Sequence, residues 1–168
     1  AASLHSMTTF LPFLNTTPEL PGFNHRVENG KKAGLDMVTK LNNGTITCRK
    51  TIVSGKTKII DTVDVVCHSM GFAYSLGMIQ ELQKAGIPVG RYYIIAPENG
   101  CSGSVPNNIE EAWQYGSNEV LDPIREQDGI APQCKVDGID KLGYKGGRVF
   151  IPESAPRGFF DCHLIKNY

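Results

Sequence analysis

Long apolar runs and an excess of charge are both missing from this sequence. No apolar stretch approaches the roughly 20 residues of a membrane-spanning helix, and the N-terminus lacks the basic start and apolar block of a secretory signal peptide. The 17 Lys and Arg residues balance the 17 Asp and Glu residues, and no run of basic residues stands out. We therefore expect neither a membrane span nor nucleic acid as a partner, because nucleic-acid binding depends on a basic surface.

The cysteines lack the spacing of a metal site. They stand at positions 48, 67, 101, 134 and 162, form no C-x-x-C pair, and match no zinc pattern with the four histidines. Neither a metal nor a cofactor is therefore expected. An odd number of cysteines leaves at least one thiol free. Cys101 and Cys134 lie in loops rich in Gly and Pro and could either pair in an oxidising compartment or stay reduced, because the sequence does not fix the compartment.

What the chain does have is an abrupt change of hydrophobic period around Ser69. Residues 63–67 form a short apolar run rich in valine, which is typical of a buried strand in a parallel sheet. Apolar residues then recur every three or four positions, as in a helix that ends near Gly86: Phe72, Leu76, Ile79 and Leu82. Ser69 lies where the two periods meet, so the pattern predicts a serine on a sharp turn from strand to helix.

The turn sequence Cys67-His68-Ser69-Met70-Gly71 resembles the nucleophile elbow of the α/β-hydrolase family, G-x-S-x-G, with cysteine in place of the first glycine. Such an elbow is strained and needs small residues two positions before and after the serine, a condition that Cys67 and Gly71 meet. The resemblance implies an α/β fold, with a mainly parallel sheet and flanking helices, in which Ser69 is the nucleophile and the Met70 amide is one oxyanion-hole donor. A serine that only caps the helix is the alternative interpretation.

Further periodic segments predict the rest of the fold. We expect a helix over residues 26–41, a β-hairpin inserted at about 45–60, and later strands at 91–96, 112–117 and 148–151. The strand–helix–strand order around Ser69 predicts parallel pairing, with the elbow strand in the centre of the sheet. No segment before residue 26 resembles the first strands of the family, so residues 1–168 are expected to form a single hydrolase-like domain that is incomplete at its N-terminus.

A serine hydroxyl needs a histidine base and usually an acid that orients the imidazole. In the hydrolase order the acid and then the histidine follow the serine, and His163 is the only histidine beyond residue 68. The segment around Asp128 is similar to the acid-bearing loop of bacterial lipases, which makes Asp128 the first candidate acid. Asp122 also lies in a segment similar to a hydrolase acid loop and stays an alternative. Either residue could instead serve a turn, because Asp before Pro or Gly favours one.

The resemblance implies a serine hydrolase that cleaves small-molecule or lipid carboxylic esters, lipase-like or esterase-like, through an acyl-enzyme on Ser69. Acyl transfer to an alcohol or amine would use the same residues and stays open. A non-catalytic hydrolase-like scaffold or binding domain of a larger protein is the alternative from another class. A sheet without the family's first strands would expose an unpaired edge, so we also expect self-association or continuation into a longer chain.

Overall fold

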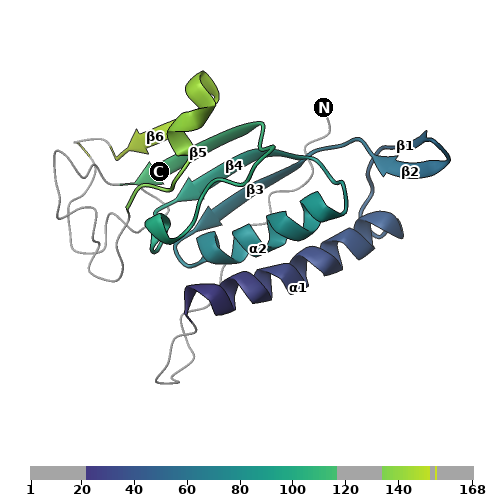
Figure 1. Ribbon diagram of the computed structural model, residues 1–168, viewed down its shortest axis with the longest axis horizontal. Coiled ribbons are helices and arrows are strands. Elements are labelled where there is room, and N and C mark those ends of the chain that lie inside the picture. Colours follow the sequence, from purple (N-terminus) through teal and green to yellow (C-terminus); the bar gives the residue numbers. More distant parts are fainter. Residues whose placement is uncertain (1–21, 117–133, 152–153, 155–168) are drawn as a thin grey trace.

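The computed structural model describes residues 22–116, 134–151 and 154, and they form an α/β structure around one sheet of parallel strands (Figure 1). The elements follow one another as α1 (Phe23–Asn42), β1 (Lys50–Val53), β2 (Lys56–Ile59), β3 (Val63–His68), α2 (Gly71–Lys84), β4 (Val89–Ile95), β5 (Glu111–Gly116) and β6 (Gly146–Phe150). Short 3-10 helices lie at Gly100–Ser102 and Ile139–Lys145. The predicted α/β class and the predicted strands and helices within the described residues are confirmed.

The main sheet of the described chain has the strand order β3-β4-β5-β6, and every neighbouring pair is parallel. The carboxyl ends of the strands therefore share one edge of the sheet. Open parallel sheets bind their ligands at this edge, where loops leave successive strands. The elbow serine and the segments that follow β4, β5 and β6 all begin there.

The predicted central position of the elbow strand is wrong for the described part of the chain. There β3 pairs with β4 alone and forms an edge of the four-stranded sheet. Its alternate residues Val63, Val65 and Cys67 are buried, whereas the residues between them are half-buried. An apolar run indicates that both faces of a strand are buried. It does not indicate how many strands pair with that strand in the sheet. The burial was therefore predictable and the pairing was not.

The helix after the elbow lies between the sheet and α1 (Figure 1). Its apolar residues pack on the inner face of β3 and β4, and its other side meets α1 so closely that glycine is required. A Cβ on Gly30 would overlap the carbonyl oxygen of Tyr74, and one on Gly77 would overlap that of Val27. Neither of the two described α-helices combines the length and the apolar character that a membrane crossing requires.

The predicted hairpin is confirmed as β1 and β2, an antiparallel pair in a small sheet of its own. Ser54 and Gly55 connect the strands with φ angles of 51° and 74°, the left-handed pair that a two-residue hairpin turn demands. Most of the hairpin is exposed, and it extends beyond the end of the main sheet (Figure 1).

Candidate active site

Ser69 occupies the sharp turn that the sequence predicts between β3 and α2. Its φ of 55° is left-handed, a conformation that costs a non-glycine residue roughly 1–3 kcal/mol and persists only where surrounding contacts hold it. Three backbone hydrogen bonds do so. The Ser69 amide donates to the Ile95 carbonyl at 3.0 Å, and the Ser69 carbonyl accepts from the amides of Phe72 at 3.1 Å and Glu98 at 3.2 Å. The predicted strand–turn–helix geometry is therefore confirmed.

Small residues on either side of Ser69 let the strand and the helix approach. A Cβ placed on Gly71 would lie 3.8 Å from the Cβ of Cys67, which is ordinary van der Waals contact. Burial raises the pKa of the Cys67 thiol to about 11, so at neutral pH this sulfur is a protonated thiol and a poor nucleophile.

The positive end of the α2 dipole lies beside the serine, and no side chain caps it. Met70 is the N-cap residue, and the first turn contains no acidic residue. The amides of a first helical turn lack partners within the helix, and together with the helix dipole they favour negative charge. This arrangement suits the predicted role of the Met70 amide as an oxyanion donor.

Ser69 is only 7% exposed. A buried position favours electrostatic stabilisation of an oxyanion, because a low dielectric strengthens fixed donors. Two cavities lined by described residues lie elsewhere. One of about 260 Å³ is bordered by residues 104–109 and 137–142, and one of about 300 Å³ by the hairpin and the end of α2.

The predicted base and acids, His163, Asp128 and Asp122, lie outside the described residues. The described strands show only where their segments begin. β5 ends at Gly116 and β6 at Phe150, both at the edge of the sheet where Ser69 lies. The assignment of His163 and of either aspartate stays a prediction.

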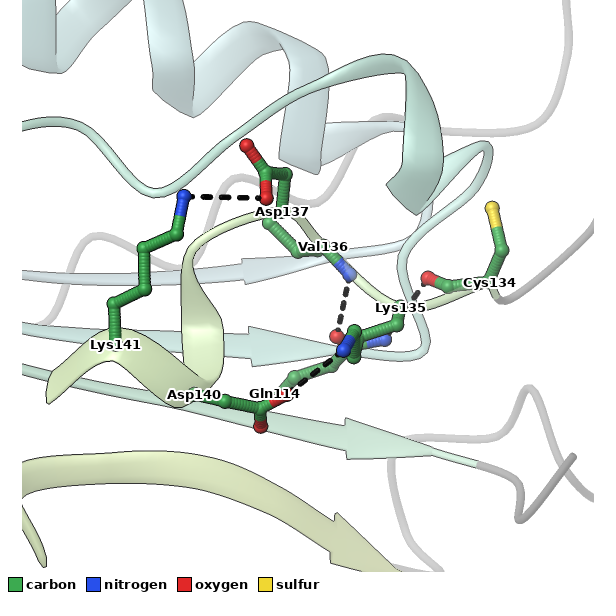
Figure 2. A network of polar contacts seen from close by, with 7 residues as sticks. All are labelled: Gln114, Cys134, Lys135, Val136, Asp137, Asp140 and Lys141. Atoms are coloured by element: carbon green, nitrogen blue, oxygen red, sulfur yellow. Dashed lines mark hydrogen bonds and ion pairs between the residues drawn. The ribbon is translucent and has the colours of Figure 1, made fainter. Parts of the chain in front are cut away.

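The chain is anchored firmly where it returns from residues 117–133. Cys101 and Cys134 form a disulfide, which answers the question of pairing that the sequence left open. The buried side chain of Gln114 on β5 donates to the Cys134 carbonyl at 3.1 Å and accepts from the Val136 amide at 2.8 Å (Figure 2). The side-chain amide of Gln114 thus forms the two kinds of backbone hydrogen bond that a paired strand would form, and it holds this segment against β5.

Backbone pairing and two ion pairs extend this anchor, and the ion pairs are drawn in Figure 2. The Asp137 amide donates to the Gly103 carbonyl at 3.3 Å, and the Asp137 carbonyl accepts from Val105 at 2.8 Å. Lys135 and Lys141 pair with Asp140 and Asp137, respectively, at the surface. The role of Gln114 in holding this segment was not predicted from the sequence. The available signal was its inward position in the alternating strand, where a lone amide must find partners.

A largely buried ion pair lies next to the elbow, and it was not predicted from the sequence. Arg26 of α1 contacts Glu98 with 2.9 Å between Nη1 and Oε1, and the two side chains are 11% and 12% exposed. The backbone amide of Glu98 is one of the donors that hold Ser69. The same end of α1 brings Phe23 edge-on to Phe72, with 6.1 Å between ring centroids. The pair therefore joins α1 to the loop that fixes the elbow.

No group of three or more His, Cys, Asp or Glu side chains within residues 22–116 and 134–151 could hold a metal ion. Comparison of the chain with protein-family models, with curated proteins and with solved structures found no match. The interpretation of the site therefore depends on the geometry of its described residues.

Proposed function

We propose that this protein is a serine hydrolase of carboxylic esters, lipase-like or esterase-like, with an α/β-hydrolase type of elbow and an acyl-enzyme on Ser69. One observation carries the proposal. Ser69 adopts a left-handed backbone conformation at the carboxyl end of a parallel strand, directly before a helix whose first turn has no side-chain cap. That is the arrangement by which a strand–turn–helix presents a nucleophile next to an anion-stabilising site.

In the proposed mechanism His163 removes the proton from the Ser69 hydroxyl as its oxygen attacks the ester carbonyl carbon. The resulting oxyanion is stabilised by the Met70 amide. Collapse of this intermediate returns the proton to the leaving alcohol and leaves the acyl group on Ser69. Water, deprotonated by His163, then attacks the acyl carbon and releases the carboxylate, while Asp128 or Asp122 holds the imidazole in the required tautomer.

The order of the chain at the sheet edge supports these roles. Ser69 follows β3, both candidate acids follow β5, and the candidate base follows β6. These three strands belong to one parallel sheet with the order β3-β4-β5-β6. Each of the segments that follow them therefore leaves the sheet at the same edge. Residues far apart in the sequence can therefore meet there.

Reaction with a fluorophosphonate probe, followed by mass spectrometry of the labelled peptide, tests the nucleophile. We expect labelling at Ser69, its loss in Ser69→Ala, and normal labelling in Ser54→Ala. Ser54 is a matched control because it is also left-handed but lies on the distant, exposed hairpin turn. A folded protein that is neither labelled nor turns over a p-nitrophenyl ester would refute catalysis and favour a binding or scaffold role.

The alternatives within catalysis are also separable. Asp128→Asn and Asp122→Asn should differ sharply, because replacing a triad acid lowers kcat by a factor on the order of 10⁴. If both variants keep full turnover, neither aspartate is the acid. Product analysis with an added primary alcohol distinguishes hydrolysis from acyl transfer, since only a transferase yields the new ester as its main product.

A further inference from the structure

Three buried polar side chains lie directly beneath the elbow, and each comes from a different element. Cys67 is on β3, Tyr92 on β4 and Ser75 on α2, and each is at most 6% exposed. The Cys67 sulfur is 3.7 Å from the Tyr92 hydroxyl, which is 2.6 Å from the Ser75 hydroxyl. Ser75 in turn donates to the Phe72 carbonyl at 2.7 Å. The apolar core surrounds this polar cluster.

The direction of these hydrogen bonds follows from the number of protons. The single Ser75 hydroxyl proton goes to the Phe72 carbonyl, so the 2.6 Å contact must use the Tyr92 proton. Tyr92 oxygen then accepts from the Cys67 thiol. Burial raises the pKa of the Tyr92 hydroxyl well above its usual value and that of the Cys67 thiol to about 11, so both keep their protons.

The chain of hydrogen bonds closes a ring around the elbow. It begins at Cys67, two residues before Ser69, and ends at the carbonyl of Phe72, whose amide donates to the Ser69 carbonyl. A movement of Ser69 relative to the strand or the helix would therefore break part of the ring. Buried networks in which every group is satisfied hold one arrangement and resist alternatives.

We infer that Cys67, Tyr92 and Ser75 form a directed hydrogen-bond relay that positions Ser69 for attack, so that Cys67 is a positioning residue and more than a small substitute for glycine. The inference rests on the proposed role of Ser69 as nucleophile. Two explanations of the cysteine at position 67 then differ in what they predict. If only size matters, Cys67→Gly restores the common form of the motif and leaves Ser69 as reactive as before, whereas the relay requires the thiol proton.

The test measures the maximal rate of Ser69 labelling and the probe's dissociation constant separately, in variants that remain folded. We expect Cys67→Gly and Cys67→Ala, which each remove one buried hydrogen bond, to lower the maximal rate about five- to tenfold with unchanged probe affinity. The nearly isosteric Tyr92→Phe removes the contacts with both Cys67 and Ser75 and should lower the rate at least as much. Cys67→Ser keeps a donor and should recover most of the rate. Cys48→Ala, which removes a thiol outside the ring, should have no effect.

Coupling provides the sharper criterion. The double variant Cys67→Ala with Tyr92→Phe should react no more slowly than Tyr92→Phe alone, because Tyr92→Phe already removes the hydrogen bond between Cys67 and Tyr92. Independent, multiplying effects would overturn the inference, as would a Cys67→Gly protein that reacts as fast as the wild type. Either result leaves the proposed function standing if the wild-type protein is labelled at Ser69.

Hydrogen exchange tests the relay without any need for catalysis. The Ser69 amide donates to the Ile95 carbonyl of β4, and the Phe72 amide donates to the Ser69 carbonyl. Both amides should exchange at least about fivefold faster in Tyr92→Phe and Cys67→Ala than in the wild type. If the wild-type protein is not labelled, the proposed function fails and this measurement alone decides the relay. Unchanged protection of both amides in both variants would overturn it.

Discussion

Removal of the Cys101–Cys134 disulfide should destabilise the protein by a predictable amount. The bond joins residues separated by 33 positions, and the loop that it closes contains β5. For a loop of that length, the entropy lost by the cross-linked unfolded chain corresponds to about 3.7 kcal/mol at 25 °C. Replacing both cysteines by serine should therefore lower the free energy of unfolding by roughly this amount, or lower Tm by about 7–15 °C for a chain of this size.

Chemical denaturation monitored by circular dichroism, with and without a phosphine reductant, measures this effect. Reductant should shift the wild-type midpoint toward that of the double-serine variant and leave the variant unchanged. Cys48→Ser is the matched control, because Cys48 is a free cysteine, and it should remain sensitive to reductant. A loss below about 1 kcal/mol in the double-serine variant would refute the reasoning, since the Gln114 contacts would then hold the segment without help from the cross-link.

Further changes have equally specific outcomes. Gly30→Ala should lower the free energy of unfolding by about 2–3 kcal/mol, because its methyl group overlaps the backbone of α2, and an unchanged denaturation midpoint would contradict the close helix contact. Gln114→Ala should lower the free energy of unfolding by about 2–4 kcal/mol, because it leaves two backbone groups without partners. Gln114→Glu should also destabilise the protein, since a carboxylate cannot donate to the Cys134 carbonyl. Equal stability of the wild type and both variants would argue against these hydrogen bonds. Above pH 9 the unfolded chain loses the Cys67 proton before the folded protein does, because burial raises the folded pKa from 9.0 to about 11. Stability should therefore fall between pH 9 and 11, and a Cys67→Ala profile as steep as the wild type would exclude this cause.

The elements that local patterns specify were predictable from the sequence. A valine-rich apolar run located β3, apolar spacing located α2, and the periodic pattern at about 45–60 located the hairpin, because each signal depends on neighbours within a few residues. The turn at Ser69 was predictable for the same reason. Its left-handed φ follows from the need to pass from strand to helix within two residues.

Features that depend on distant residues were not predictable. The position of β3 at the edge of the described sheet depends on which strands pair, and the apolar run does not determine that pairing. The contact between Arg26 and Glu98 joins residues 72 positions apart, and the partners of Gln114 belong to a segment 20 or more positions away. Cys101 and Cys134 were one possible pair among five cysteines, and only their spatial proximity selects them.

The close contact between α1 and α2 limits how this protein can change during evolution or design. At Gly30 and Gly77 the backbones leave no room for a methyl group, so substitutions there cannot be absorbed by repacking side chains. The loop that follows β4 contains a position of the same kind, because a Cβ on Gly100 would overlap the carbonyl oxygen of Cys134. Directed-evolution libraries should therefore keep Gly30, Gly77 and Gly100 constant and vary positions where no backbone lies within reach of an added methyl group.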